Sequence, residues 1–136
     1  MRFQAFCKLR LGAAAGLLCL LAAGCGTVSA YKVEYLAAPR YAPTDWRSVE
    51  ILQAMPEKPC EKLGEVVANV SVDPSPPVSK IETVIRRRAA ELGATAVVLI
   101  KDKVEVAGSW LGGPAWAPVV TPIHSRVIVG VAVRCQ

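Results

Sequence analysis

The sequence predicts a small α+β domain with the element order β-β-α-β-β, in which one helix packs on a mostly antiparallel sheet. Three observations lead to this prediction: a period-two alternation over residues 63–72, a helical apolar stripe over 79–92, and valine-rich segments near residue 97 and at the C-terminus. The chain has 136 residues, of which 53% are hydrophobic and 20% are charged. This composition is sufficient for one folded domain, with a helix on one sheet face supplying the core.

A short strand over 48–53 is expected to open the sheet. It is rich in β-branched residues and places Val49 and Ile51 on one side. The segment 54–61 contains two prolines and is expected to be a loop that carries Cys60.

The strand expected over 63–72 has the clearest alternation in the chain. Its inward-facing residues are Val66, Ala68, Val70 and Val72. The proline-rich segment 73–77 ends it, because proline cannot donate a hydrogen bond to a strand ladder.

The helix that follows has recognisable ends. Ser79 and Glu82 match a capping box, and Gly93 favours the left-handed conformation that ends many helices. Its apolar stripe consists of Ile81, Ile85, Ala89 and Leu92.

Two further strands are expected over 95–100, with a weaker continuation to 106, and over 126–134. The glycine- and proline-rich segment 107–125 between them is expected to be a loop. In the last strand, the inward-facing residues are expected to be Val127, Val129, Val131 and Val133, with Cys135 on the same side.

The opposite sheet face is expected to carry Val67, Val97, Leu99 and Ile128. Such a face is too apolar to be left to water. We therefore expect it to be covered by the segment before residue 46, by the tryptophan-containing loop, or by a partner.

The N-terminus has the features of an export signal. Residues 1–24 contain three basic residues, a short apolar segment and small residues at the end, which together describe a secretory signal peptide. Cys25 follows Ala-Ala-Gly, which resembles the lipobox of bacterial lipoproteins. In that family the matching thiol receives diacylglycerol, the leader is removed, and the new amino group is acylated.

This resemblance implies that the protein contacts a membrane through an N-terminal lipid. The residue after Cys25 is Gly, not Asp, which implies the outer membrane as the destination. Residues 25–45 are then expected to be the lipidated cysteine and a flexible tether, and 46–136 the domain. Two alternatives stay open: cleavage after Ala30 to give a soluble periplasmic protein, and an uncleaved membrane span over 11–31.

Two cysteines remain beyond the proposed lipidation site, Cys60 and Cys135. A pair of cysteines in an oxidising compartment is most simply a disulfide. The alternative is a metal site that uses these two thiols together with His124, although no closely spaced ligand pair marks such a site.

Composition argues against several classes of function. The chain has one His and three Asp, and it lacks HExxH, CxxC and phosphate-loop motifs, so we expect neither enzymatic activity nor a cofactor. Removing the three leader bases from the 16 basic residues leaves 13 against 11 acidic ones. A balance of +2 does not favour nucleic acid as a partner.

Three stretches together resemble a known family: 49–51 with 63–66, the run "AAELGATAVV" over 89–98, and 129–132. They are similar to the RcsF-like group of bacterial outer-membrane lipoproteins, which share a β-β-α-β-β domain. The resemblance covers roughly residues 46–136 and implies that fold. In the stress sensor of this group, a sheet face and loops contact envelope partners, and its four cysteines lie in stretches that contain none here.

The sharpest functional candidates are Trp110 and Trp116 in the long expected loop. Long connections without secondary structure are commonly binding segments, and exposed tryptophans anchor protein partners or lipid headgroups. The alternative is that one or both fold back over the sheet. The hypothesis is a non-enzymatic, lipid-anchored envelope protein that acts as an interaction, stress-sensing or assembly module. The alternatives are a metal-binding lipoprotein using Cys60 and Cys135, and a purely structural envelope component.

Overall fold

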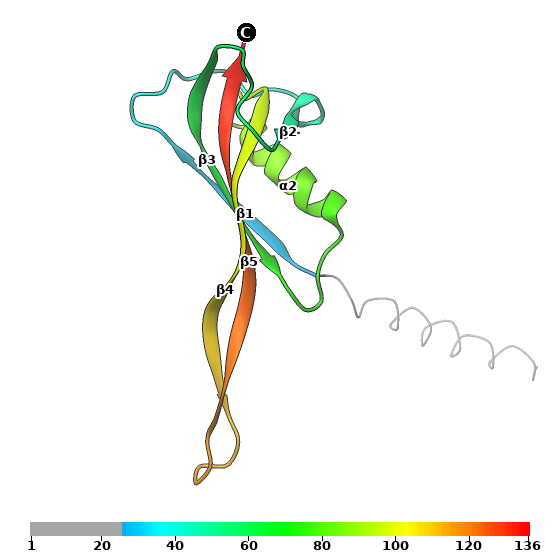
Figure 1. Cartoon of the computed structure of the whole chain (residues 1–136), viewed down its shortest axis with the longest axis vertical. Coiled ribbons are helices and arrows are strands. Elements are labelled where there is room, and N and C mark those ends of the chain that lie inside the picture. The colour runs from blue at the N-terminus through cyan, green and yellow to red at the C-terminus, as the bar shows by residue number, and fades with distance from the viewer. Residues whose placement is uncertain (1–25) are drawn as a thin grey trace, which may run out of the picture.

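The computed structural model describes residues 26–136, which form one five-stranded mixed sheet with a single α-helix on one face (Figure 1). The elements are β1 (Val28–Glu34), the 3₁₀ turn η1 (Trp46–Ser48), β2 (Glu50–Leu52), β3 (Cys60–Ser71), α2 (Val78–Ala90), β4 (Ala96–Gly112) and β5 (Val119–Cys135). The strand order is β1-β3-β5-β4-β2, and all neighbours are antiparallel except β2 and β4. The predicted α+β class with one helix is confirmed, but the number and order of the strands differ from β-β-α-β-β.

The additional strand, β1, lies inside the segment that we expected to be a flexible tether. It pairs with β3 from Val28 opposite Val70 to Glu34 opposite Gly64. The sequence did not predict β1, because Lys32 occupies an inward-facing position. Its ammonium lies there 3.6 Å from a carboxylate oxygen of Glu91. A charged residue at that position interrupts the alternation by which strands are recognised.

Helix α2 packs on the sheet through the predicted stripe of Ile81, Ile85, Ala89 and Leu92, all of which are buried. Gly93 has a φ of 77° at the helix end, as predicted. The capping box was wrong. Pro77 is the N-cap residue without a side-chain hydrogen bond, because the helix begins directly after the prolines, one residue before Ser79.

The prediction of which residues of β4 and β5 face the helix was also wrong. Val97, Leu99 and Ile128 belong to the helix-side core together with Ala68 and Ala132. The valines at 131 and 133 are buried in a second cluster, on the other face. Both faces of these strands are apolar, so alternation alone could not choose between them. The helix packs where the sheet carries many small residues, which permit close approach.

The second cluster lies on the sheet face away from α2. Val98, Val131 and Val133 pack there with Leu52 and with the predicted disulfide, which is confirmed between Cys60 and Cys135. These cysteines lie directly opposite each other in the β3–β5 register and are 75 residues apart in sequence. Closing a loop of this length stabilises the fold by roughly 4 kcal/mol in the chain-entropy description.

The segment 107–125, expected to be a loop, is instead the outer part of a long hairpin. Strands β4 and β5 stay paired from Ala96 opposite Val133 to Gly112 opposite Val119. The register shifts twice within β4, between Leu99 and Lys101 and again between Val106 and Gly108, and such bulges increase the local twist. No helix within residues 26–136 is long and apolar enough to cross a membrane.

Candidate interaction site

The outer part of the β4–β5 hairpin projects from the rest of the domain (Figure 1). We call that rest, residues 26–105 and 125–136, the body. The last pair between β3 and β5 joins Ser71 and Ser125. Beyond it, the described residues provide no third strand, so residues 106–124 form a two-stranded ribbon, which we call the arm. A two-stranded hairpin is marginally stable alone in water, so the arm depends on its attachment to the sheet.

The arm is both uncharged and exposed. No Asp, Glu, Lys or Arg occurs from 106 to 125, and every residue of the arm except Gly112 is exposed. Its exposed large hydrophobic side chains are Val106, Trp110, Leu111, Trp116, Val119, Val120 and Ile123. A monomeric protein rarely exposes so continuous an apolar surface unless something binds to it.

Both faces of the arm are apolar. Residues opposite each other in an antiparallel pair share a face, so one face carries Trp110 and Ile123, and the other carries Leu111, Val120 and Val106. The arm therefore differs from an ordinary surface hairpin, in which one face is polar.

Both predicted tryptophans lie on the arm, and neither folds back over the sheet. Trp110 is 61% exposed and Trp116, in the loop at the tip, is 87% exposed. The Trp110 ring lies against Gly112, where an added Cβ would come within 2.0 Å of the ring. The sequence pattern pointed to these two residues but not to the aliphatic residues of the arm. The uncharged run from 106 to 125 was the available signal.

The base of the arm is marked by charged residues. The Arg126 guanidinium donates two hydrogen bonds to the Asp102 carboxylate, one of them 2.6 Å long, across β4 and β5. These hydrogen bonds lower the pKa of Asp102 and raise that of Arg126. On β4, the Lys101 ammonium lies 2.6 Å from a carboxylate oxygen of Glu105. The change from charged to uncharged residues therefore occurs where the arm leaves the body.

The N-terminal end of the described chain lies at the same end of the sheet as the arm. Gly26 is buried, and its carbonyl accepts a hydrogen bond of 2.9 Å from the Lys80 ammonium. The Thr27 amide donates to the Ser71 hydroxyl at 2.9 Å. Cys25, the predicted lipidation site, lies outside the described residues.

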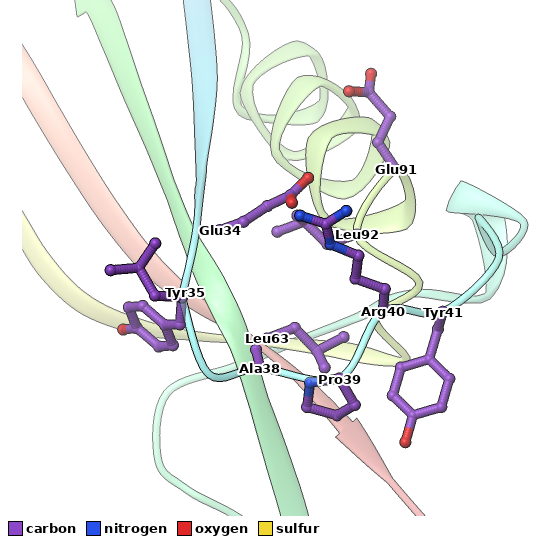
Figure 2. Close-up of a pocket in the computed structure, with 10 residues that line it drawn as sticks. Glu34, Tyr35, Ala38, Pro39, Arg40, Tyr41, Leu63, Glu91 and Leu92 are labelled. Atoms are coloured by element: carbon purple, nitrogen blue, oxygen red, sulfur yellow. The ribbon is translucent and has the colours of Figure 1, made fainter.

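A pocket of about 350 Å³ lies beside the C-terminal end of β1 (Figure 2). It is lined by Glu34, Tyr35, Leu36, Ala38, Pro39, Arg40, Tyr41, Leu63, Glu91 and Leu92. Figure 2 shows the Arg40 guanidinium directed towards the Glu34 carboxylate. The sequence did not predict this pocket, because most of its lining belongs to residues 34–41, which were expected to be part of a flexible tether.

The tyrosines that line this pocket donate to carboxylates elsewhere in the body. Tyr35 donates to Glu65 at 2.9 Å, and burial followed by this hydrogen bond raises the pKa of Tyr35. Tyr41 donates to Glu61, which raises the pKa of Tyr41. The Arg134 guanidinium lies 4.4 Å from the centre of the Tyr41 ring. These contacts hold the segment after β1 on the body.

The residues of the alternative metal site are not brought together. Cys60 and Cys135 are joined in the disulfide, whereas His124 lies on the arm, opposite Val106. Within the part of the chain that the structure describes, no group of three or more His, Cys, Asp or Glu side chains is arranged to hold a metal ion.

No protein-family model and no curated protein matches this chain. Among solved structures, it is similar to the crystal structure of a Francisella virulence factor, FvfA, with a TM-score of 0.49 and 14% sequence identity. The match covers 78% of this chain and 97% of that chain. A likeness at this level indicates nothing about function.

Proposed function

We propose that the protein is a non-enzymatic, lipid-anchored interaction module of the bacterial envelope. In this proposal, Cys25 carries the lipid, the disulfide-linked body is the scaffold, and the arm is the surface that contacts another envelope component. The resemblance to RcsF-like outer-membrane lipoproteins belongs to the same proposal.

One observation carries it: the arm combines an uncharged sequence with exposed apolar side chains on both faces. Desolvating such a surface incurs no penalty for buried charge, and each buried tryptophan removes about 150–250 Å² from water. Tryptophan is also one of the residues enriched at energetically dominant positions of interfaces.

The body supplies rigidity. The disulfide joins β3 to β5, and β5 continues directly into the arm. The two hydrogen bonds between Arg126 and Asp102 connect both strands of the hairpin at the base of the arm. A binding element held in this way loses less conformational entropy when it meets a partner than a flexible loop would.

The experiment that tests the interaction is in-cell photo-crosslinking, with a photoreactive amino acid placed at position 110 or 116. We expect a specific adduct from the arm. The matched control position is Leu36, which is fully exposed but lies on the body. Adducts that are equally abundant from Leu36 and from the arm would contradict the proposal.

The anchor is tested separately by Cys25→Ser. We expect this change to move the protein from the membrane fraction to the soluble fraction, and we expect Cys7→Ser, within the leader, to have no such effect. Mass spectrometry of the mature protein with an unmodified N-terminus at Tyr31 would show that the lipid assignment is wrong.

A further inference from the structure

We propose that the arm inserts its tip into the lipid surface that holds residue 25, so that the protein contacts the membrane at two points. This inference rests on the proposed function, because it names the partner of the arm as lipid. It follows from where the arm and the N-terminal end of the domain lie.

The arm and the chain leading to residue 25 leave the same end of the sheet. The Thr27 carbonyl accepts a hydrogen bond of 3.0 Å from the Ser71 amide. Ser71 in turn is paired with Ser125, the β5 residue that directly follows the arm in the sequence. Since β1 and β5 are separated only by β3, the N-terminal strand lies about 10 Å from the base of the arm.

Gly26, the first residue that the structure describes, already belongs to the body. Gly26 is buried against Pro74 and Pro76, and the hydrogen bond from the Lys80 ammonium holds its carbonyl. A lipid on residue 25 would therefore place this end of the sheet directly at the membrane surface.

The arm is long enough to enter that surface. At about 3.3 Å per residue, the strand from 106 to 112 spans roughly 20 Å, which is similar to the thickness of one leaflet with its headgroups. Its backbone limits the depth, because a two-stranded ribbon leaves unpaired N–H and C=O groups on both edges, and the hydrocarbon region does not satisfy them. We therefore assign insertion to the tip, at the depth of the headgroups and the outer acyl chains.

The chemistry of the arm favours lipid over a protein docked on one side. Both faces of the arm are apolar, and lipid that surrounds the arm would bury Leu111 and Val120 on one face as well as Trp110 on the other. A protein docked on one side would leave one of these faces in water. Tryptophans are enriched at the boundary between lipid and water. The charged residues at the base, Asp102 and Arg126 among them, would stay in water.

The test uses the full chain with Cys25→Ser in two single-tryptophan forms, one retaining Trp116 and one retaining Trp46, with Phe at the other tryptophan positions. Each is mixed with a large excess of phosphatidylcholine vesicles that contain brominated acyl chains as quenchers, because without the lipid on residue 25 the arm alone binds a membrane only weakly and reversibly. We expect the emission of Trp116 to shift to shorter wavelength and to be quenched, and that of Trp46, next to α2, to be unaffected. Because the arm is uncharged, added phosphatidylglycerol or salt should not change the quenching.

A pair of substitutions measures the energetic contribution. Leu111→Ser, on the arm, should lower the vesicle partition coefficient roughly tenfold, as expected for the loss of one buried leucine. Leu36→Ser, an equivalent change on the body, should leave it unchanged.

Unquenched Trp116 in vesicle-bound protein would overturn this inference. If the arm then forms a specific protein adduct in cells, the proposed function stands with a protein as the partner. If Trp116 is neither quenched nor crosslinked, both the inference and the proposed function fail.

Discussion

The body and the arm are built from the same two strands but differ in what surrounds them. In the body, Val97 and Ala132 are fully buried in the core beneath α2, and Val133 is fully buried in the second hydrophobic cluster on the other face. In the arm, Val106, Leu111 and Val120 remain exposed along the same β4–β5 ladder.

This contrast separates what forms the hairpin from what stabilises it. Backbone pairing continues through both regions, whereas the buried apolar side chains nearest the arm are Val98 on β4 and Ile128 on β5. Changes in the body should therefore alter folding, and changes in the arm should alter interactions while leaving folding almost unaffected.

The largest expected effect is the loss of the disulfide. The double variant Cys60→Ala, Cys135→Ala should lower the free energy of unfolding by roughly 4 kcal/mol, because the unfolded chain regains the freedom of a 75-residue loop. Urea unfolding of the two forms measures the difference. An unchanged midpoint would show that the disulfide does not stabilise the body.

A matched pair of glycine substitutions compares the two regions directly. Gly64→Val should destabilise the protein by about 3 kcal/mol, because a Cβ at this position would lie 2.2 Å from the Val33 carbonyl oxygen and would force β1 away from β3. Gly108→Val, in the arm, should change stability by no more than about 0.5 kcal/mol, since no atom lies within 4 Å of the added Cβ. Thermal unfolding measures both, and equal effects would contradict the contrast.

The ion pair at the base of the arm predicts a small pH dependence. The lowered pKa of Asp102 means that its carboxylate stabilises the folded state at pH values above its unfolded pKa of about 3.9. This stabilisation is lost as the pH falls through the lower folded pKa. The pair is partly exposed, so the loss should be at most about 1 kcal/mol. Asp102→Asn should remove this component of the acid dependence, as measured by urea unfolding at neutral and acidic pH. An unchanged acid dependence would show that the pair does not contribute.

The smallest expected effect on stability is that of the arm tip. Trp116→Ser should change the free energy of unfolding by no more than about 0.5 kcal/mol, because the side chain is 87% exposed. The same change should weaken the proposed interaction. A large loss of stability would mean that Trp116 packs on the body.

Much of the body could be predicted from the sequence because its signals are local. The stripe from Ile81 to Leu92, the left-handed Gly93 and the alternation from Val66 to Val70 were confirmed. Val72, predicted to face inward at the end of that strand, is instead 40% exposed and lies beyond β3. The disulfide was predicted from the number of cysteines in a chain expected to be exported, and it too was confirmed.

The errors arose where long-range contacts outweigh local patterns. Strand β1 was not predicted because Lys32 faces inward, where its ammonium forms an ion pair with Glu91, a residue far along the chain. The arm was expected to be a loop because it contains Gly108 and Pro122, yet the ladder from the body continues through both. The sequence identified Trp110 and Trp116 as candidates and left open whether they fold back over the sheet. The structure shows both exposed on the arm, whose strands were not predicted.

The most direct test of the central claim is oxidative footprinting of the tryptophans in intact cells and in the purified protein. We expect Trp110 and Trp116 to react readily in the purified protein, where both are exposed, and to be protected in the envelope, where the arm is in contact with its partner. Trp46, on the body, should react equally in both. Equal reactivity of Trp110 and Trp116 in cells and in solution would contradict the claim that the arm is the interaction surface.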